Sequence, residues 1–441
     1  MITLLIIADD FTGALDTGVQ FAAAGTVVRV VTDTGYDYRK ADEGVRVLVM
    51  DAETRHLDSR EAYEVVWNIT KRAMGCGIPF IYKKTDSALR GNIGSELTAL
   101  LDASGQDILP FIPAFPQMGR ITREGIHYIN DVPVKDSVFG KDPFEPVTCS
   151  FIPDIIHQQS SIQVEVIKEE DGDNNKVLVE DTQVFDDGPL SRIAVYDARS
   201  QEGLAAVALD LYHKGRLSVM AGCAGFASVL PGLLGLEGRE SYAPEFIPRF
   251  LAACGSVNPI TKKQLDHAEG HGFVRIRLTP RQKLDRGYWK TDEGQTVLRK
   301  WMLQCQMERR SILDSNDYDG TDETMEYARE KGIGLDEVRT RIADSMGYIL
   351  KNMVERGLNS TLLITGGDTL LGFMNQINVC EREPCCHVLR LRTICIRSFP
   401  SQADLAQKTC WYSWQIRYWI RKRGYYADTV HIKDASCGLQ R

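Results

Sequence analysis

The chain opens with a short apolar run that ends on two carboxylates and turns at once into a helical pattern. Residues 2–8 are long enough for one buried strand, and Asp9 and Asp10 follow directly. In an open sheet of parallel strands, ligands bind outside the carboxyl ends of the strands. Because side chains alternate along a strand, we expect only one of the two acids to face a ligand. The structural alternative is an aspartate that caps the helix.

The same strand-turn-helix unit recurs along the chain and predicts an α/β fold. Apolar or valine-rich runs alternate with segments of helical spacing such as 59–74, which is the pattern of parallel sheets covered by helices. A stretch without periodicity, 235–250, separates two such series. We therefore predict two domains with mainly parallel sheets and flanking helices, residues 1–240 and 245–384. The predicted strands are 2–8, 27–32, 45–51, 79–83, 108–113, 193–196, 217–221, 250–254 and 361–365.

Composition narrows the class of protein. The 441 residues carry a formal net charge of -8, which disfavours a nucleic-acid-binding protein. No apolar run approaches the roughly 20 residues that span a bilayer, and no basic region precedes the first apolar run. Eleven cysteines without zinc-ligand spacing fit reduced thiols. We predict a cytoplasmic protein without a protein-bound metal site, a membrane or a nucleic-acid partner; its oligomeric state, homo-oligomer included, stays open.

A second cluster of polar residues follows the strand predicted at 79–83. Two lysines, an aspartate, a serine, an arginine and an asparagine precede a helical segment that continues through 96–101. Arginine binds carboxylates with two parallel hydrogen bonds, and aspartate and asparagine bind hydroxyls, so this set suits an anionic, hydroxylated ligand. The alternative is a helix capped by Asp86 or Ser87 with solvated basic residues. The candidate binding residues are Lys84, Asp86, Ser87, Arg90 and Asn92.

Two glycine-containing turns and one long loop are the remaining candidates for functional segments. The turns at 255–256 and 366–369 each follow a predicted strand and open a helix. Backbone N–H groups there can bind an anion, and Asp368 or Thr369 can hold a metal-phosphate or a ribose; glycine also serves such turns for steric reasons alone. The long loop at 113–144 is rich in Gly, Pro and aromatic residues and is predicted to be ordered. Its single histidine, His127, is interpreted as structural.

Several common signatures are absent from the sequence. There is no G-x-x-x-x-G-K-[ST] phosphate loop and no G-x-G-x-x-G after a strand. A Walker-type phosphate loop is therefore excluded, and an NAD-linked dehydrogenase is disfavoured. Protein-kinase and G-x-S-x-G signatures are missing as well.

Six spaced motifs resemble those of the four-carbon acid sugar kinase family. They occur in the family's order and cover residues 1 to about 384. The motifs are ADDFTGA (8–14), KTDSALRGN (84–92), PAFPQMGR with GIHY (113–120 and 125–128), DPF (142–144), GSVNPIT (255–261) and TGGDT (365–369).

The resemblance implies a phosphoryl transfer from MgATP to a terminal hydroxyl of threonate, erythronate or 3-oxotetronate. It implies an N-terminal domain for the sugar acid, a C-terminal domain for ATP, and an active site in the interdomain cleft. Such chemistry needs positioning, charge neutralisation and a carboxylate that accepts the hydroxyl proton. Asp9 and Asp10 are the catalytic candidates, and Lys84, Asp86 and Arg90 are candidates for the acid's carboxylate and hydroxyls. The positions that match nucleotide binding are Ser256, Gly366, Gly367, Asp368 and Thr369.

Beyond residue 384 the resemblance stops. The family's Ser-Gly-Gly-Phe-Gly turn, which helps enclose the nucleotide, does not occur in 385–441. Residues 381–441 contain two glycines and are net +6, from eleven Lys or Arg and five Asp or Glu. We interpret this tail as a frameshift in the gene or its sequence record; a basic element for nucleic acid or membrane surfaces is the alternative. A genuine tail predicts an ATP site that lacks one wall and a sheet without its last strands, and hence weak activity or a poorly folded second domain. The alternative function is a catalytically impaired, tetronate-binding remnant of such a kinase.

Overall fold

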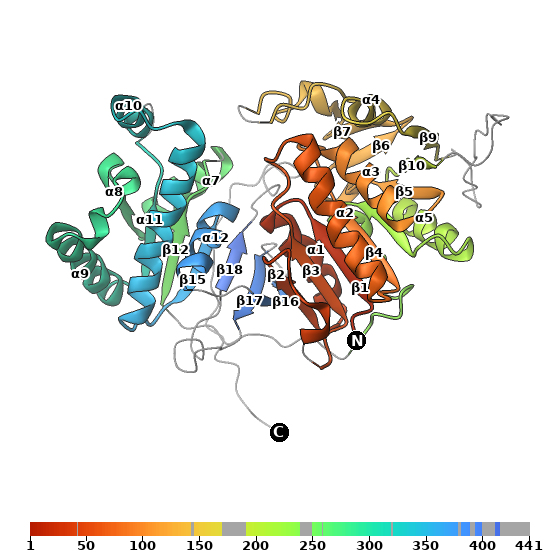
Figure 1. Ribbon diagram of the computed structural model, residues 1–441. Coiled ribbons are helices and arrows are strands. Elements are labelled where there is room, and N and C mark those ends of the chain that lie inside the picture. Colours follow the sequence, from red (N-terminus) through yellow and green to blue (C-terminus); the bar gives the residue numbers. More distant parts are fainter. Residues whose placement is uncertain are drawn as a thin grey trace.

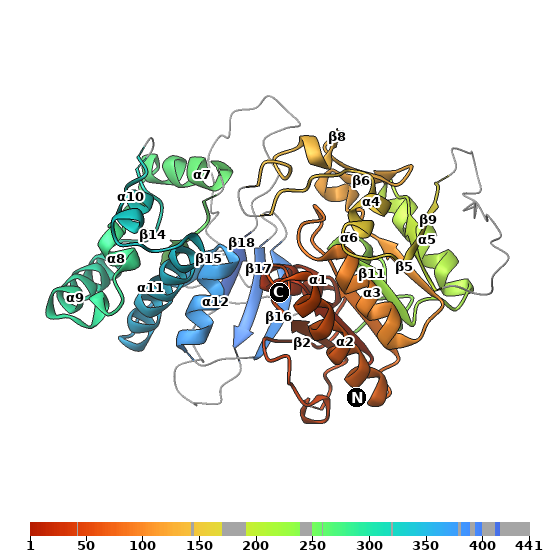
Figure 2. The same ribbon diagram turned by 45° about the horizontal axis from the view of Figure 1, so that its top comes forward.

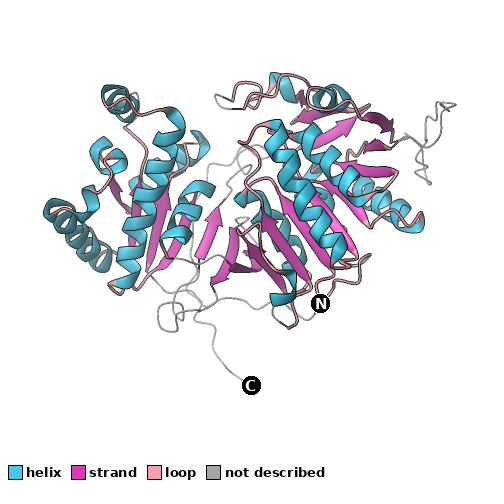
Figure 3. Cartoon of the chain, viewed as in Figure 1, coloured by secondary structure: helices cyan, strands magenta, loops and turns pink. Residues whose placement is uncertain are grey.

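In the computed structural model of the protein, helices alternate with mainly parallel strands (Figures 1 and 3). This arrangement confirms the predicted α/β fold class. Fifteen strands of the described residues form one continuous sheet, and three further short strands form a second one. The structure describes residues 1–41, 43–142, 145–169, 191–238, 249–257, 259–318 and 321–377, and the backbone of the strands between 381 and 414.

The N-terminal half of the sheet has parallel strands in the spatial order β2-β3-β1-β4-β11-β5-β10-β9. The chain leaves β1 toward β2 and β3 and later reaches β4 on the other side of β1. The two neighbours of β1, which are β3 and β4, therefore flank a topological switch point, and open sheets bind ligands at such points. The strands are β1 Leu4–Ala8, β2 Val28–Val31, β3 Val47–Asp51, β4 Phe80–Lys84, β5 Ile108–Ile112, β9 Gln163–Ile167, β10 Arg192–Tyr196 and β11 Val219–Gly222. The helices are α1 Phe11–Ala23, α2 Ser59–Gly75, α3 Ile93–Ser104, α4 Ile152–His157, α5 Gln201–His213 and α6 Ala224–Ala227.

Helices cover this half of the sheet on both faces. Leu4 and Ile6 of β1 belong to the core that contains residues of α1, whereas Leu5 and Ile7 belong to the core that contains residues of α2 and α3. The alternation of side chains along a strand sends these pairs to opposite faces. A strand that is buried on both faces must be apolar throughout, which explains the uninterrupted run at the start of the chain.

The C-terminal half of the sheet has parallel strands in the order β13-β14-β12-β15. Strands β12 (Phe250–Cys254) and β15 (Thr361–Thr365) occupy the residues predicted for them. The others are β13 Val274–Arg277 and β14 Arg310–Asp314; the helices are α7 Pro259–Gly270, α8 Pro280–Leu284, α9 Asp292–Met307, α10 Glu323–Glu330, α11 Leu335–Glu355 and α12 Gly367–Gln376. In the described part of the chain, no helix combines the length and apolar character needed to cross a bilayer.

Three strands of the tail lie between the two halves (Figure 1). β16 (Glu381–Val388) pairs with β2 and β17 (Thr393–Ser398), and β18 (Trp411–Trp414) pairs with β17 and β15. We expected a genuine tail to leave the sheet without its last strands, and these pairings correct that expectation. Strand pairing uses backbone groups, so it does not require the family's side-chain motif. The rest of the tail lies outside the described residues, and its frameshift origin stays a prediction.

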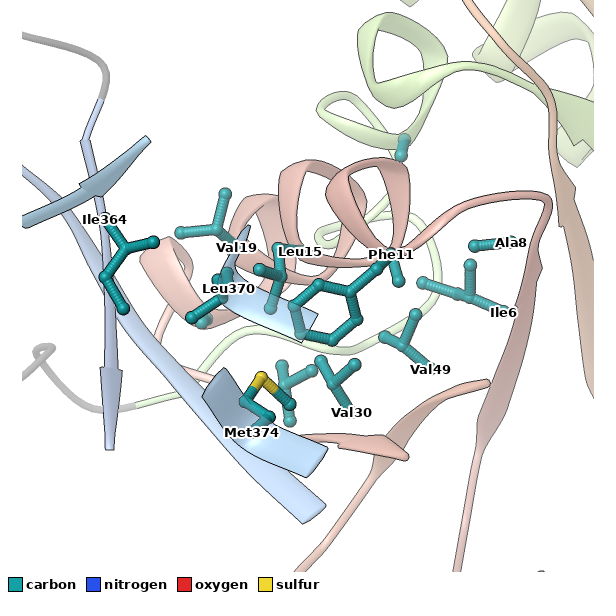
Figure 4. Packing of buried hydrophobic residues seen from close by; sticks show 14 of the residues in the cluster. Ile6, Ala8, Phe11, Leu15, Val19, Val30, Val49, Ile364, Leu370 and Met374 are labelled. Carbon is teal, nitrogen blue, oxygen red and sulfur yellow. The ribbon is translucent and has the colours of Figure 1, made fainter. Parts of the chain in front are cut away.

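The two halves also share a hydrophobic core (Figure 4). Leu15 and Val19 of α1 belong to the same buried cluster as Ile364 of β15 and Leu370 and Met374 of α12. Each fully buried aliphatic side chain contributes about 1.5–3 kcal/mol relative to its exposed state. The apolar contact therefore holds α12 against α1.

A small antiparallel sheet lies within the segment predicted as a long ordered loop. It consists of β6 (Arg120–Arg123), β7 (Ile126–Ile129) and β8 (Val132–Pro133) and lies beside α4 (Figures 1 and 2). The strands span at most four residues, too few for periodicity to reveal. Residues 143, 144 and 258 of the family motifs lie outside the described residues.

Strand β4 ends in two buried lysines that point to opposite faces. Lys83 Nζ lies 2.9 Å from Glu96 Oε2 of α3, and both side chains are at most 1% exposed. Because neighbours on a strand alternate, Lys84 faces α1 instead. Only Lys84 therefore reaches the acids at the end of β1.

We expect Lys83→Met to lower the free energy of unfolding by about 3–5 kcal/mol, because it leaves the Glu96 carboxylate buried without a cation. The double variant Lys83→Met/Glu96→Leu should recover most of this loss, since no charge remains buried. Urea unfolding followed by tryptophan fluorescence measures both. Equal losses in the single and double variants would contradict this expectation.

Candidate active site

The carboxyl ends of β1, β3 and β4 bring the predicted acids and one lysine together. Ala8, the last residue of β1, pairs with Asp51 of β3 and Lys84 of β4. The residues that follow β1 therefore lie beside the end of β4. Lys84 contacts both Asp9 and Asp10 there, at the switch point of the sheet.

Asp9 is buried between two cations and is 2% exposed. Arg55 donates to Asp9 Oδ2 through Nε (2.8 Å) and Nη2 (2.6 Å), and Lys84 Nζ donates to Oδ1 (3.0 Å). Burial raises the pKa of Asp9, but the charges of Arg55 and the two lysines outweigh burial and hold the pKa well below its ordinary value. Asp9 is therefore ionised.

Asp10 caps α1 and shares the same two cations. Its Oδ1 accepts a hydrogen bond from the Gly13 backbone (2.9 Å) and lies 2.7 Å from Arg55 Nη2 and 3.3 Å from Lys84 Nζ. Gly13 allows this approach, because a Cβ there would lie 1.9 Å from Lys84 Nζ. The Asp10 side chain is 19% exposed, against 3% for Asp9. The structure thus confirms that Asp10 caps a helix, and its catalytic role stays a prediction.

Arg55 is a central residue that the sequence did not predict. Its guanidinium contacts Asp9, Asp10 and, at 3.6 Å, Asp86. Burial lowers the pKa of Arg55, but these three carboxylates raise it well above its ordinary value. Arg55 lies in the loop after β3, where Glu53 has a left-handed φ of 47°. No motif marks this loop; the signal that could have found it is its place after a predicted strand of the same sheet.

A second ion-pair network joins the loop after β4 to residue 142. Arg90 donates to Asp86 through Nε (2.9 Å) and Nη2 (3.1 Å), and to Asp142 through Nη1 (3.1 Å). The guanidinium also lies over the Phe139 ring, 5.2 Å from its centre. Burial raises the pKa of Asp86, but Arg90 and Arg55 lower it well below its ordinary value. Each nitrogen of the Arg90 guanidinium thus donates to a carboxylate of the protein.

Ser87 and Asn92 hold the same loop in place. The Ser87 carbonyl lies 3.0 Å from His127 Nε2, and Thr122 Oγ1 lies 3.3 Å from His127 Nδ1. Burial lowers the pKa of His127 to about 4, so the neutral ring donates from Nε2 and accepts at Nδ1. This agrees with its interpretation as structural. Asn92 donates to two backbone carbonyls of the loop that carries Arg55 (3.0 and 2.8 Å).

The predicted nucleotide-binding turn begins α12 and lies against α1. Gly366 precedes the helix with a φ of 103°. A Cβ on Gly367 would lie 2.4 Å from Thr12 Oγ1, and one on Gly255 would lie 1.8 Å from Thr369 Oγ1. Glycine at these positions allows the close approach. The first N–H groups of α12 have no acceptor within the helix, so this helix start can bind an anion.

Ser256 belongs to the turn beside α12. A Cβ on Gly366 would lie 3.2 Å from the Ser256 backbone nitrogen, and Ser256 Oγ lies 3.5 Å from Thr261 Oγ1. The two turns predicted from their sequences alone are therefore neighbours at the ends of β12 and β15.

A chain of polar contacts crosses from α12 to the N-terminal half. Arg339 of α11 donates to Asp368 through Nε (2.6 Å) and Nη2 (2.7 Å), and its Nη1 lies 2.8 Å from His56 Nε2. His56 Nδ1 contacts Glu145 Oε1. Because arginine only donates, His56 Nε2 accepts and Nδ1 carries the proton. No sequence pattern indicated Arg339 or His56.

These features define a protein with two adjoining polar sites. Buried acids and cations at a switch point suit a small, hydroxylated anion. A helix start suited to phosphate lies directly beside them. The arrangement is that of a two-domain α/β protein which brings a small polar ligand to a phosphate-bearing one.

Models of protein families match two domains in this chain, one for each of the two polar sites. A sugar-binding N-terminal domain matches residues 4–230, and a nucleotide-binding C-terminal domain matches residues 251–397. The chain belongs to the four-carbon acid sugar kinase family, which combines these two domains. The second match continues to residue 397, past residue 384, at which we expected the resemblance to stop.

Relatives of known activity cover most of the chain. A D-threonate kinase from Salmonella typhimurium LT2 is 28% identical, and a D-erythronate kinase from Heliobacterium modesticaldum is 27% identical. Each alignment covers 83% of this chain and 84% of the relative.

Solved structures share the fold. A Salmonella typhimurium LT2 protein has a TM-score of 0.72 at 18% identity and covers 94% of this chain and 95% of its own. A Haemophilus influenzae protein has a TM-score of 0.64 at 16% identity and covers 93% and 95%. This likeness confirms the α/β architecture.

We expect Arg55→Met to destabilise the protein most near neutral pH. The folded pKa of Asp9 lies below its ordinary value of 3.8, so its interactions stabilise the fold above that pH and are lost as the pH falls through the folded pKa. Removing Arg55 should cost about 3–5 kcal/mol at about pH 7, and the difference from wild type should shrink below about pH 4. Unfolding midpoints across this pH range measure the effect.

The matched control is Arg60→Met, which removes an 89% exposed arginine from the start of α2. This variant should keep the wild-type midpoint at every pH. A pH-independent loss in Arg55→Met would contradict the role assigned to its contact with Asp9.

Proposed function

We propose that the chain is an ATP-dependent kinase that phosphorylates a terminal hydroxyl of threonate, erythronate or 3-oxotetronate. The observation that carries the proposal is the approach of Gly367 to Thr12, because a helix start suited to phosphate then adjoins the acids at the end of β1. Phosphoryl transfer depends on this kind of juxtaposition. The named activities of the D-threonate and D-erythronate kinases support the substrate class.

Asp10 is the proposed proton acceptor. Its Oδ1 takes the contacts with Gly13, Arg55 and Lys84, so Oδ2 is the oxygen left for the hydroxyl of the substrate. Asp9 is more deeply buried and holds Arg55 and Lys84 in position. The ammonium of Lys84 then lies close enough to the acceptor to neutralise charge that develops during transfer.

We propose that the five substrate-binding candidates from the sequence all serve the site, three by supplying groups for the substrate and two by holding its loops. Lys84 supplies positive charge, and Asp86 and Ser87 supply oxygens for hydroxyls. Arg90 and Asn92 act by holding the loops, since their polar groups already bind protein atoms.

The proposed nucleotide site comprises Ser256 and the turn at 366–369. Burial, and then the charges of Asp10 and Asp368, raise the pKa of Glu53, so carboxylates concentrate between the two sites. Mg²⁺ prefers oxygen ligands, and Glu53 and Asp368 are the side chains that fit a Mg²⁺ bound with ATP, where it would neutralise phosphate charge. Within the described residues, no three metal-ligating side chains form a metal site by themselves.

The proposal includes the organisation of the chain. Residues 1–240 form the sugar-acid domain, 245–384 the nucleotide domain, and 385–441 the atypical tail. The location is cytoplasmic, the partners are the sugar acid and ATP, and the oligomeric state stays open.

A second candidate function is a tetronate-binding remnant without turnover. The glycine-poor, net +6 composition of residues 381–441 favours it, because the family has a nucleotide-enclosing turn there. A coupled ADP-release assay with MgATP and threonate, erythronate and their 3-oxo forms separates the two. Acid-dependent ADP release supports the kinase; a thermal shift with an acid, but none with MgATP and no turnover, supports the remnant. The mass of the expressed protein tests the reading frame of the tail.

We expect Asp10→Asn to lower kcat by about 10²- to 10⁴-fold, because an amide does not accept the hydroxyl proton. Asparagine still caps a helix, so the fold and the dissociation constant of the acid should change little. Steady-state ADP release and a thermal shift with the acid measure the two quantities. Wild-type kcat in this variant would exclude Asp10 as the proton acceptor.

The contact between Arg339 and His56 should affect turnover more than binding, because it fixes α12 relative to the N-terminal half. His56→Gln keeps an acceptor near the Nε2 position, whereas His56→Asn keeps a donor near the Nδ1 position. We expect kcat to fall about 10- to 100-fold in His56→Asn and to stay near wild type in His56→Gln, with similar KM values. If kcat instead falls in His56→Gln and stays near wild type in His56→Asn, the contact of His56 with Glu145, and not the one with Arg339, supports turnover.

A further inference from the structure

One arginine beside the site has no part in the ion-pair networks described above. Arg120 begins β6 and is 5% exposed. Its backbone forms two hydrogen bonds with Phe115 (2.7 and 3.1 Å). Gly119 makes the preceding turn with a φ of 66°, and a Cβ there would lie 2.3 Å from Asn130 Oδ1. The backbone thus fixes the start of a buried, cationic side chain.

The guanidinium of Arg120 has no carboxylate partner among the residues that the structure describes. Arg55 and Arg90 each contact two or more carboxylates, and their pKa values are raised despite burial. Burial lowers the pKa of Arg120, and the charges of Asp86 and Asp16, neither of which forms an ion pair with it, do not compensate for burial. A buried cation without a counter-ion destabilises a protein unless a ligand supplies the anion.

Phe139 lies next to both Arg120 and Arg90. Their Cζ atoms lie 5.4 and 5.2 Å from the centre of the ring. Arg90 directs its donors to Asp86 and Asp142. Arg120 is therefore the neighbouring cation whose fork of donors can receive a ligand.

We propose that Arg120 binds the carboxylate of the sugar acid, the role that the sequence suggested for Arg90. This inference rests on the proposed function. A guanidinium receives a carboxylate through two parallel hydrogen bonds, and exclusion of water strengthens the pair. The charge of Asp86 acts on Arg120, Asp86 lies 3.6 Å from Arg55, and Arg55 contacts Asp10. This order matches an acid with its carboxylate at Arg120 and its terminal hydroxyl at Asp10.

The experiment compares acids with uncharged four-carbon polyols. Isothermal titration of the full chain with threonate, erythronate, threitol and erythritol gives the dissociation constants. Arg120→Met should weaken binding of the preferred acid about 10- to 100-fold and leave binding of the polyols unchanged. Arg120→Lys keeps the charge without the fork and should give an intermediate value.

The unfolding midpoint of the ligand-free protein is a second readout. Arg120→Met removes an unpaired buried charge and should keep or raise the midpoint. A structural arginine would do the opposite, with a lower midpoint and unchanged acid binding. The matched control is Arg123→Met, which removes an exposed arginine of the same strand that lies over Tyr128; it should change neither quantity.

Two results would overturn this inference and leave the proposed function intact. They are wild-type acid binding in Arg120→Met, and loss of folding in that variant while Arg120→Lys binds the acid as wild type does. If wild type binds none of the acids, the proposed function fails and this inference fails with it. Weaker binding of the acid with an unchanged or higher midpoint supports the assignment.

Discussion

The buried charge balance around Asp9 holds the functional end of this sheet together. A carboxylate that is 2% exposed is tolerated only when cations and hydrogen bonds surround it. Arg55 and Lys84 provide both, and their side chains are themselves 8% and 5% exposed. Asp9 follows β1, Lys84 ends β4, and Arg55 lies after β3, so one network joins three neighbouring strands. The polar groups are therefore oriented before any ligand arrives, which favours electrostatic catalysis.

The second constraint is the approach of the two halves of the chain. Gly367 at the start of α12 contacts Thr12 of α1, and the buried cluster that holds Leu15 also holds Leu370. Apolar packing sets the distance, and glycine permits it. Arg339 adds a polar connection to His56. Together these contacts explain how a sugar-binding and a nucleotide-binding domain can serve one reaction.

Prediction from the sequence succeeded where a local pattern carries the information. The apolar runs at β1, β12 and β15 predict buried strands, because parallel strands that are covered on both faces must be apolar. It failed at β6 to β8, because strands of at most four residues are too short to show a periodicity, and it also missed β9, β13 and β14. Arg55 was missed since nothing in its loop marks it. For Arg90, the residue type indicated carboxylate binding; the structure shows it bound to the carboxylates of Asp86 and Asp142, and its contact with a substrate stays a prediction.

The order of residues is sufficient to infer the α/β fold class, the strand ends at which polar groups collect and the family. These properties follow from short-range patterning and from motifs within single turns. The pairing of the charges follows from the fold instead. Asp9 lies 46 residues from Arg55 and 75 from Lys84 in the sequence. Distances of a few ångströms also decide whether a buried arginine pairs with carboxylates of the protein, as Arg90 does, or can bind the anion of a ligand, as we propose for Arg120. Chain packing sets those distances, which is why they could not be read from sequence spacing.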